Sequence, residues 1–148
     1  MTATNHVVMG ALVATVFHNP LIAIPVAVLS HFALDSLPHF DYLEKNQKSL
    51  KSLIGLSTDM AIAASILVAI YILHPASVWL VLACAVAAAS PDLMWLYYLV
   101  SKKKHPKEAR PSIVRFHSNI QGHTGPKLWP VELVWLGLIG SIVAGRLI

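Results

Sequence analysis

Five apolar segments, separated by polar connections, constrain the fold of this 148-residue chain more than any other feature. A helix needs about 20 apolar residues to cross roughly 30 Å of hydrocarbon, and backbone polar groups in lipid must be paired within the segment. The last two segments meet this length, the second and third meet it with their polar ends, and the first is short. We therefore expect an all-α membrane bundle of about five helices in one integral-membrane domain, residues 1–148. The segments cover residues 7–17, 21–37, 60–73, 77–100 and 128–148.

The composition agrees with a bilayer as the solvent. Hydrophobic residues make up 56% of the chain and charged residues only 12%, about half of the charged share of soluble domains. The single cysteine, Cys84, lies inside an apolar segment, so no disulfide can form within one chain. We expect membrane lipids as surroundings and no nucleic-acid partner, and the oligomeric state stays open.

Positive charge between the segments is confined to two of the four connections. Residues 44–51 and 102–127 contain lysines and arginines, whereas the other two turns contain none. Because Lys and Arg accumulate on the cytoplasmic side of membrane proteins, we expect both basic loops and the N-terminus to be cytoplasmic at the inner membrane. The basic run is then expected to attract anionic lipid head groups.

The last of these loops contains a predicted amphipathic helix between Pro111 and Gly122. Proline suits a first helical turn and glycine a helix end. Ile113, Phe116 and Ile120 fall on one face, which is typical of a helix that lies at a membrane interface.

Ionisable side chains are predicted to gather at the cytoplasmic end of the bundle. A charged group within a span costs at least about 2.5–3.5 kcal/mol, and the lysines and arginines that could pair with these groups lie in the loops. A divalent metal would balance the carboxylates; zinc accepts His and Asp ligands, and manganese or iron would also do so. The candidate ligands are His6, His31, Asp35, His39, Asp59 and Asp92.

Spacing adds detail to this set. His31 and Asp35 are four residues apart and share a helix face. Pro38 is expected to place His39 in a turn, and Pro91 to kink the fourth helix beside Asp92.

The third helix is expected to begin near Gly55, which puts Asp59 one turn in. The opposite half is expected to hold Glu132 and Arg146 but no aspartate.

Several of these residues resemble a known family. An Asn5-His6 pair that opens an apolar helix, the stretch SHFALDSLPHFD, and an aspartate in each of the next two helices are similar to the small membrane-bound metal-dependent hydrolases of bacteria. That family is itself distantly similar to zinc-dependent phospholipase C. The likeness covers roughly the first 95 residues. It implies a helical bundle, phosphoester hydrolysis, and metal ligation by His6, His31, Asp35, Asp59 and Asp92.

The functional expectation is a membrane-embedded hydrolase that cleaves a phosphoester of a lipid or lipid-linked substrate. Asp92 and His117 are the candidate catalytic residues, because a group not fully used in ligation can move a proton. Two other classes stay open: a metal-binding transporter and a non-catalytic assembly or scaffold protein. The ionisable groups fill only one half of the bundle, which disfavours a transport pathway.

Each candidate also has a structural interpretation. His31 with Asp35 can be a hydrogen bond between helix neighbours, and Asp59 or Asp92 can orient a histidine without touching a metal. His6 can be an ordinary interfacial histidine, and His117 an ordinary loop residue.

Overall fold

The chain folds into helices, as predicted. The computed structural model describes residues 1–40, 50–73, 76–94 and 111–147, and within them the only β pairing is an isolated bridge between His39 and Thr124. The elements are α1 (Ala3–Val16), α2 (Pro20–Asp35), α3 (Leu50–Leu73), α4 (Val78–Ala89), the 3-10 helix η1 (Ser90–Met94), α6 (Ser112–Ile120), the 3-10 helix η3 (Pro126–Leu128) and α7 (Trp129–Leu147).

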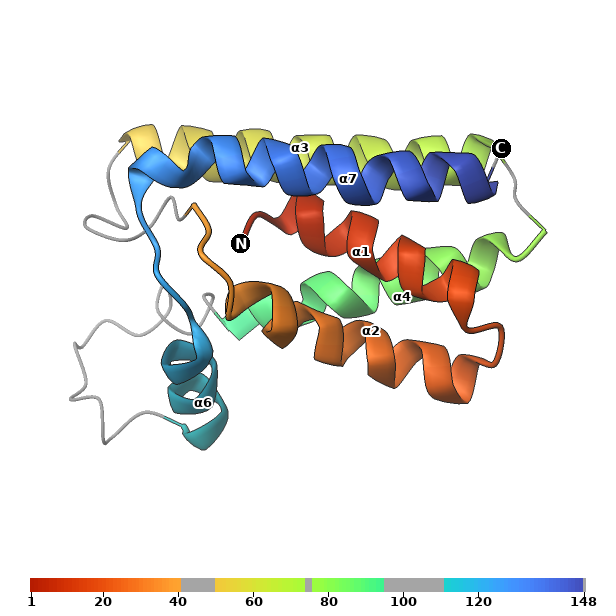
Figure 1. Ribbon diagram of the computed structural model, residues 1–148, viewed down its shortest axis with the longest axis horizontal. Helices are drawn as coiled ribbons and strands as arrows, with labels where there is room; N and C mark the ends of the chain where they lie inside the picture. The colour runs from red at the N-terminus through yellow and green to blue at the C-terminus, as the bar shows by residue number, and fades with distance from the viewer. Residues whose placement is uncertain (41–49, 74–75, 95–110, 148) are drawn as a thin grey trace.

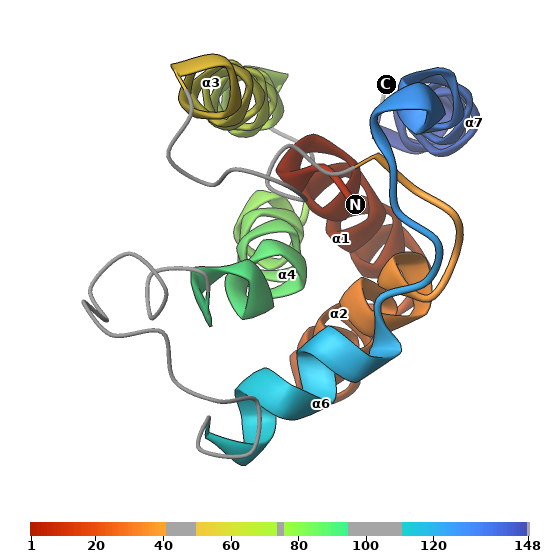
Figure 2. The ribbon, with the colours of Figure 1, turned by 90° about the vertical axis from the view of Figure 1, so that its left-hand side faces the viewer.

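Helix α1 is the centre of the bundle. It packs against α2, α3, α4 and α7, and Figure 2 shows it enclosed by them, with α3 and α7 set apart from each other on one side. The apolar helices alternate in direction along the chain (Figure 1). This alternation brings the start of α1, the end of α2, the start of α7 and η1 to the same end of the bundle as α6.

Helix boundaries follow local chemistry, and one of them differs from prediction. Asn19 caps α2 by accepting a hydrogen bond from the Leu21 amide, and Pro20 occupies the first turn, where its missing N–H costs nothing. Helix α3 begins at Leu50 rather than near Gly55. Asp59 therefore lies more than two turns into α3, at about 1.5 Å per residue, and not one.

Proline lies near two other helix boundaries, and the predicted position of His39 outside the second helix is confirmed. Helix α2 stops at Asp35, before Pro38, so His39 lies outside it. Regular α geometry in α4 stops at Ala89, and Pro91 sits in the 3-10 turn that follows and carries Asp92.

The α1–α4 contact depends on a glycine. A Cβ atom at Gly10 would overlap the Cys84 carbonyl oxygen and lie 2.7 Å from the Ala85 Cα. Alanines face this contact from both helices; Ala11, Ala14, Ala85 and Ala88 are fully buried. Small residues thus allow these two helices to approach each other closely.

Helices α3 and α7 carry large apolar side chains that are exposed in the described part of the chain. Both helices are long and apolar enough to cross a membrane, whereas α1, α2 and the α4–η1 helix are shorter. Contiguous exposed apolar surface of this kind marks a lipid or protein contact in soluble and membrane proteins alike. The exposed large side chains include Leu53, Ile54, Met60, Ile62, Val68 and Ile72 on α3, and Leu133, Val134, Leu138 and Ile142 on α7.

We predict that Gly10→Ala destabilises the protein. The added methyl gains about 1 kcal/mol of helix propensity, but the overlap with the α4 backbone costs about 1–3 kcal/mol and cannot be relieved by a side-chain rotation. Thermal unfolding of the purified protein in detergent should show a lower melting temperature. Gly137→Ala is the matched control, because a Cβ there meets no atom within 4 Å. An equal effect of the two substitutions would contradict the close α1–α4 contact.

Candidate metal centre

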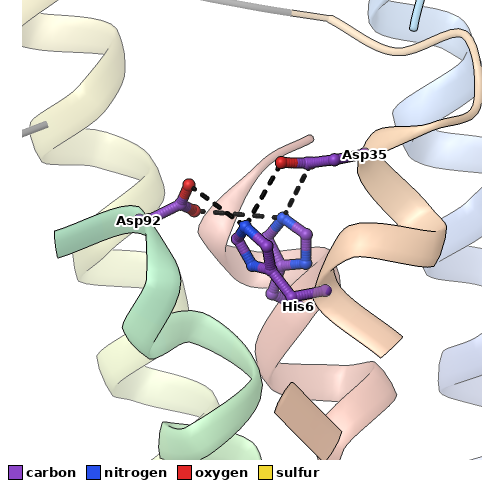
Figure 3. A group of neighbouring side chains, drawn as sticks. His6, Asp35 and Asp92 are labelled. Carbon is purple, nitrogen blue, oxygen red and sulfur yellow. Dashed lines mark ion pairs between the residues drawn. The ribbon is translucent and has the colours of Figure 1, made fainter. Parts of the chain in front are cut away.

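Four side chains meet at the end of the bundle where α1 begins and α2 ends. His6, His31, Asp35 and Asp92 each offer one ligand atom, and these four atoms all lie within 4.8 Å of one another. They come from α1, α2 and η1, and Figure 3 shows Asp35 and Asp92 on either side of the His6 ring. The structure thus brings together four of the six predicted ligands in an arrangement that could hold a metal ion.

The two carboxylates approach both imidazoles. Asp35 lies 3.2 Å from His6 Nε2 and 3.2 Å from His31 Nε2. Asp92 lies 3.9 Å from His6 Nε2 and 3.7 Å from His31 Nε2. The Asp35 Oδ1 also accepts a hydrogen bond of 2.6 Å from the amino group of Met1. The side chains of His6, His31 and Asp35 are fully buried.

His31 is oriented by the backbone of α4. Its Nδ1 lies 2.9 Å from the carbonyl oxygen of Ala88, and a carbonyl only accepts, so Nδ1 carries the proton of a neutral ring. The Nε2 lone pair then points at the carboxylates. Metal-binding histidines are commonly held in this way, with the second nitrogen on a carbonyl or carboxylate.

The His6 ring lacks a well-aligned hydrogen bond among the described residues. Both ring nitrogens are buried, and Nε2 contacts Asp35 Oδ1 at 3.2 Å without hydrogen-bond geometry. A buried polar group without a hydrogen bond costs about 1–3 kcal/mol, and such exceptions call for an explanation. An ion between His6 and the carboxylates would give Nε2 the partner that it lacks.

His117 reaches the same centre from α6. Its Nε2 lies 2.9 Å from Asp35 Oδ2 and 3.2 Å from His31 Nε2. Residues beyond α6 fasten it in place, because the Gly122 amide donates to the Asp35 carbonyl at 2.8 Å. A Cβ at Gly122 would overlap the Ser36 carbonyl oxygen, so this close approach needs glycine.

His39 and Asp59 lie outside the four-residue cluster. His39 Nδ1 is 2.8 Å from the Leu37 carbonyl oxygen, and its backbone is tied to His123 and Gly125. Burial lowers the pKa of the His39 side chain, which keeps its ring neutral near pH 7. Ligation by either residue stays a prediction.

Asp59 instead accepts hydrogen bonds from the first turn of α1. Its Oδ2 accepts from the Ala3 amide at 2.7 Å, and its Oδ1 accepts from the amide and hydroxyl of Thr4 at 3.1 and 2.6 Å. The first amides of a helix lack intrahelical partners and carry partial positive charge. A buried carboxylate at this position gives these amides hydrogen-bond acceptors and balances their partial positive charge.

The predicted position of Glu132 is wrong. It lies in the first turn of α7, at the end of the bundle that holds the cluster, and not in the opposite half. Its Oε2 accepts from Thr2 and from the Asn5 side chain at 2.6–3.2 Å, and its Oε1 accepts from the Phe40 amide at 3.0 Å. The alternation of helix direction was the signal that could have found it, since α7 starts where α1 starts.

Two side chains at this end of the bundle are partly exposed. The Asp92 side chain is 30% exposed and that of His117 is 12% exposed, whereas the side chains of His6, His31 and Asp35 are fully buried. Among the described residues of the site, Asp92 and His117 are therefore the two that are nearest to solvent.

Comparison with known proteins does not identify a family for this chain. No family model matches this sequence, and no curated protein and no solved structure matches it either. The class of protein that fold and site define is thus an all-helical, apolar bundle with a His/Asp cluster that could bind a metal.

We predict that Asp59→Ala lowers the free energy of unfolding by about 3 kcal/mol, because it leaves buried amides of α1 without a charged acceptor. Chemical denaturation in detergent would measure the change. Ser65→Ala is the matched control on the same helix, since its hydroxyl is exposed and bonds only the Ala61 carbonyl. Asp59→Ala protein as stable as the control would show that the carboxylate does not hold α1.

Proposed function

We propose that this protein is a membrane-embedded, metal-dependent hydrolase that cleaves a phosphoester of a lipid or lipid-linked substrate. The observation that carries the proposal is the cluster of His6, His31, Asp35 and Asp92, in which the buried ring nitrogens of His6 have no well-aligned hydrogen bond among the described residues. The resemblance of the sequence to small membrane-bound metal-dependent hydrolases points to the same chemistry. Zinc is the proposed ion, with manganese or iron as alternatives.

The donor set fits such an ion. Two imidazole nitrogens and two carboxylates are a normal ligand combination for zinc, and the charge of two carboxylates balances a divalent ion. His31 is already in the tautomer that presents Nε2, through its hydrogen bond to Ala88. A bound divalent ion would lower the pKa of a coordinated water towards neutrality and polarise a phosphoryl oxygen.

His117 and Asp92 are the proposed catalytic residues. Both side chains are partly exposed, so they are the residues of the site that a substrate would meet first. Asp35 Oδ2, 2.9 Å from His117 Nε2, orients the ring. We assign to His117 the transfer of a proton between water and the leaving oxygen, and to Asp92 the acceptance of a proton from the attacking water.

The surroundings suit a lipid substrate. The exposed apolar side chains of α3 and α7 favour a bilayer contact, and Ile113 and Phe116 are exposed on α6, the helix that carries His117. The proposed location is the cytoplasmic face of the inner membrane. The basic run at residues 102–107, expected to attract anionic head groups, lies outside the described residues.

Activity provides the direct test. Purified protein in detergent should hydrolyse at least one of phosphatidic acid, isoprenoid phosphates and a phosphodiester reporter. A chelator should abolish turnover, and added zinc or manganese should restore it. His117→Ala should lower the rate about 10²–10⁴-fold, the usual contribution of general acid–base catalysis, and Asp35→Asn should abolish it.

His18→Ala is the control for the activity test, since this exposed histidine lies at the opposite end of the bundle. A responsive substrate that the Asp35 variant cleaves as fast as the parent would refute the proposal. The absence of turnover on every substrate, with metal bound, would favour a metal-binding transporter or scaffold instead.

Orientation in the membrane is tested separately. In a Cys84→Ser background, we expect Lys51→Cys and Arg115→Cys to react with an impermeant maleimide only after the cells are opened. Ser77→Cys, between α3 and α4, should react from outside in intact cells, because both basic loops are expected to be cytoplasmic. Labelling of Arg115→Cys in intact cells would reverse the proposed orientation.

A further inference from the structure

Helix α6 lies across the end of the bundle. Figure 2 looks along α3 and α7 and shows α6 from the side, in front of the end of α2. In a bilayer crossed by α3 and α7, the axis of α6 would therefore run parallel to the membrane surface, as that of an interfacial amphipathic helix does. Trp129, exposed at the start of α7, lies at the same end of the bundle (Figure 1), and tryptophan is enriched at the membrane–water interface.

The side chains of α6 divide into three sectors around its axis. At about 100° per residue, Ile113, Phe116 and Ile120 form an apolar sector, of which Ile113 and Phe116 are exposed. The next sector faces the bundle and contains the buried Val114 and His117. An apolar sector and a polar sector that both lie outside the bundle suit a helix at the boundary between lipid and water. The polar sector consists of the exposed residues Ser112, Arg115 and Asn119.

The contacts that hold α6 against the bundle are made by side chains. His117 Nε2 lies 2.9 Å from Asp35 Oδ2. The rings of Phe116 and His117 pack edge-to-face against Phe32, with centroids 5.4 and 5.9 Å away. Within the described residues, no backbone hydrogen bond joins α6 itself to the bundle, and those that fasten this region begin after it, at Gly122. Among the described residues, side-chain contacts alone therefore oppose a rotation of α6 about its axis.

The charge at this end of the bundle indicates the partner of α6. Among the described residues, the exposed basic side chains there are Lys51, Arg115 and Lys127. The carboxylates of the same end are buried, apart from that of Asp92, which is 30% exposed. Positive charge beside an exposed apolar sector is complementary to a leaflet that contains anionic lipids.

From this orientation, sector pattern and charge, we infer that an anionic leaflet is the partner of α6 and holds the helix against the bundle. The apolar sector lies in the acyl boundary and the polar sector faces water, which fixes the rotation of α6 with His117 against Asp35. Without this lipid contact α6 rotates, and His117 leaves Asp35 Oδ2. The inference rests on the proposed membrane location, and its consequence for turnover rests on the proposed function.

The first measurement locates the apolar sector. The full chain, in a Cys84→Ser background, carries a nitrobenzoxadiazole label at Ile113→Cys or at Asn119→Cys, in nanodiscs of phosphatidylglycerol and phosphatidylcholine. At Ile113→Cys we expect blue-shifted emission and quenching by doxyl-labelled lipid. Dithionite should reduce this label about 10-fold more slowly than the label at Asn119→Cys, because the apolar side of an interfacial helix is buried in lipid. Equally rapid reduction at both sites would overturn the inference and favour a protein partner.

The second measurement reports the position of α6. Spin labels at Asn119→Cys and at His18→Cys, which lies at the opposite end of the bundle, should give one narrow distance distribution in the same nanodiscs. Ile113→Ser combined with Ile120→Ser should broaden this distribution, because the apolar sector then loses its lipid contact. Ser112→Ala, on the polar sector, is the control and should leave it narrow.

A label pair at His18→Cys and Lys51→Cys checks that the bundle of the double-serine variant stays assembled. A narrow distribution for α6 in this variant would overturn the link between lipid contact and the position of His117. The label at Ile113→Cys tests the lipid contact without the serine substitutions, so the test does not depend on that variant folding.

Neither measurement depends on turnover, so their failure would leave the hydrolase proposal standing. A protein that cleaves none of the substrates but shows both signals would retain the lipid-held α6 and lose the hydrolase proposal. Where both proposals hold, the double-serine variant should bind metal as the parent does. Its turnover should fall, by no more than the loss that His117→Ala causes.

Discussion

The site depends on how the first turn of α1 is held between α3 and α7. Helix amides at an N-terminus lack partners, and burying them is costly unless an acceptor is supplied. Asp59 and Glu132 supply acceptors from the two neighbouring helices, through bonds to Ala3, Thr4, Thr2 and Asn5. These hydrogen bonds fix the position of α1 along the bundle axis. His6 is one residue beyond Asn5, so they also place its ring against Asp35.

The buried acidic residues therefore divide into two groups with different tasks. Asp59 and Glu132 accept hydrogen bonds from backbone amides, hydroxyls and an amide side chain. These are neutral donors. Asp35 and Asp92 face imidazole nitrogens, and Asp35 also accepts a hydrogen bond from the Met1 amino group and lies 2.9 Å from His117 Nε2. The presence of imidazole nitrogens around a carboxylate, rather than its burial, separates the candidate ligands from the structural carboxylates.

Much of this could be predicted from the sequence, and the failures have specific causes. Apolar segment lengths gave the helices, and the four-residue spacing of His31 and Asp35 gave one face of the cluster. Helix direction also placed His6 and Asp92 at that end. The stacking of His6 on His31 could not be predicted, because it depends on the rotation of α1 relative to α2. Glu132 has no spacing pattern that identifies its partners Thr2 and Asn5, and only the alternation of helix direction indicates that it lies at the same end of the bundle as they do.

The position of the cluster connects the fold to the proposed chemistry. Close packing of α1 on α4 at Gly10 brings the α4 backbone near α2, and the Ala88 carbonyl can then hold the His31 tautomer. The same end of α4 turns into η1 at Pro91, which moves Asp92 out of the helix line and towards both histidines. If α4 continued as a regular α-helix, each residue would turn by a different angle than in the 3-10 helix η1. The Asp92 side chain would then not point towards both histidines. The prolyl turn is therefore a part of the site, although proline has no ligand atom of its own.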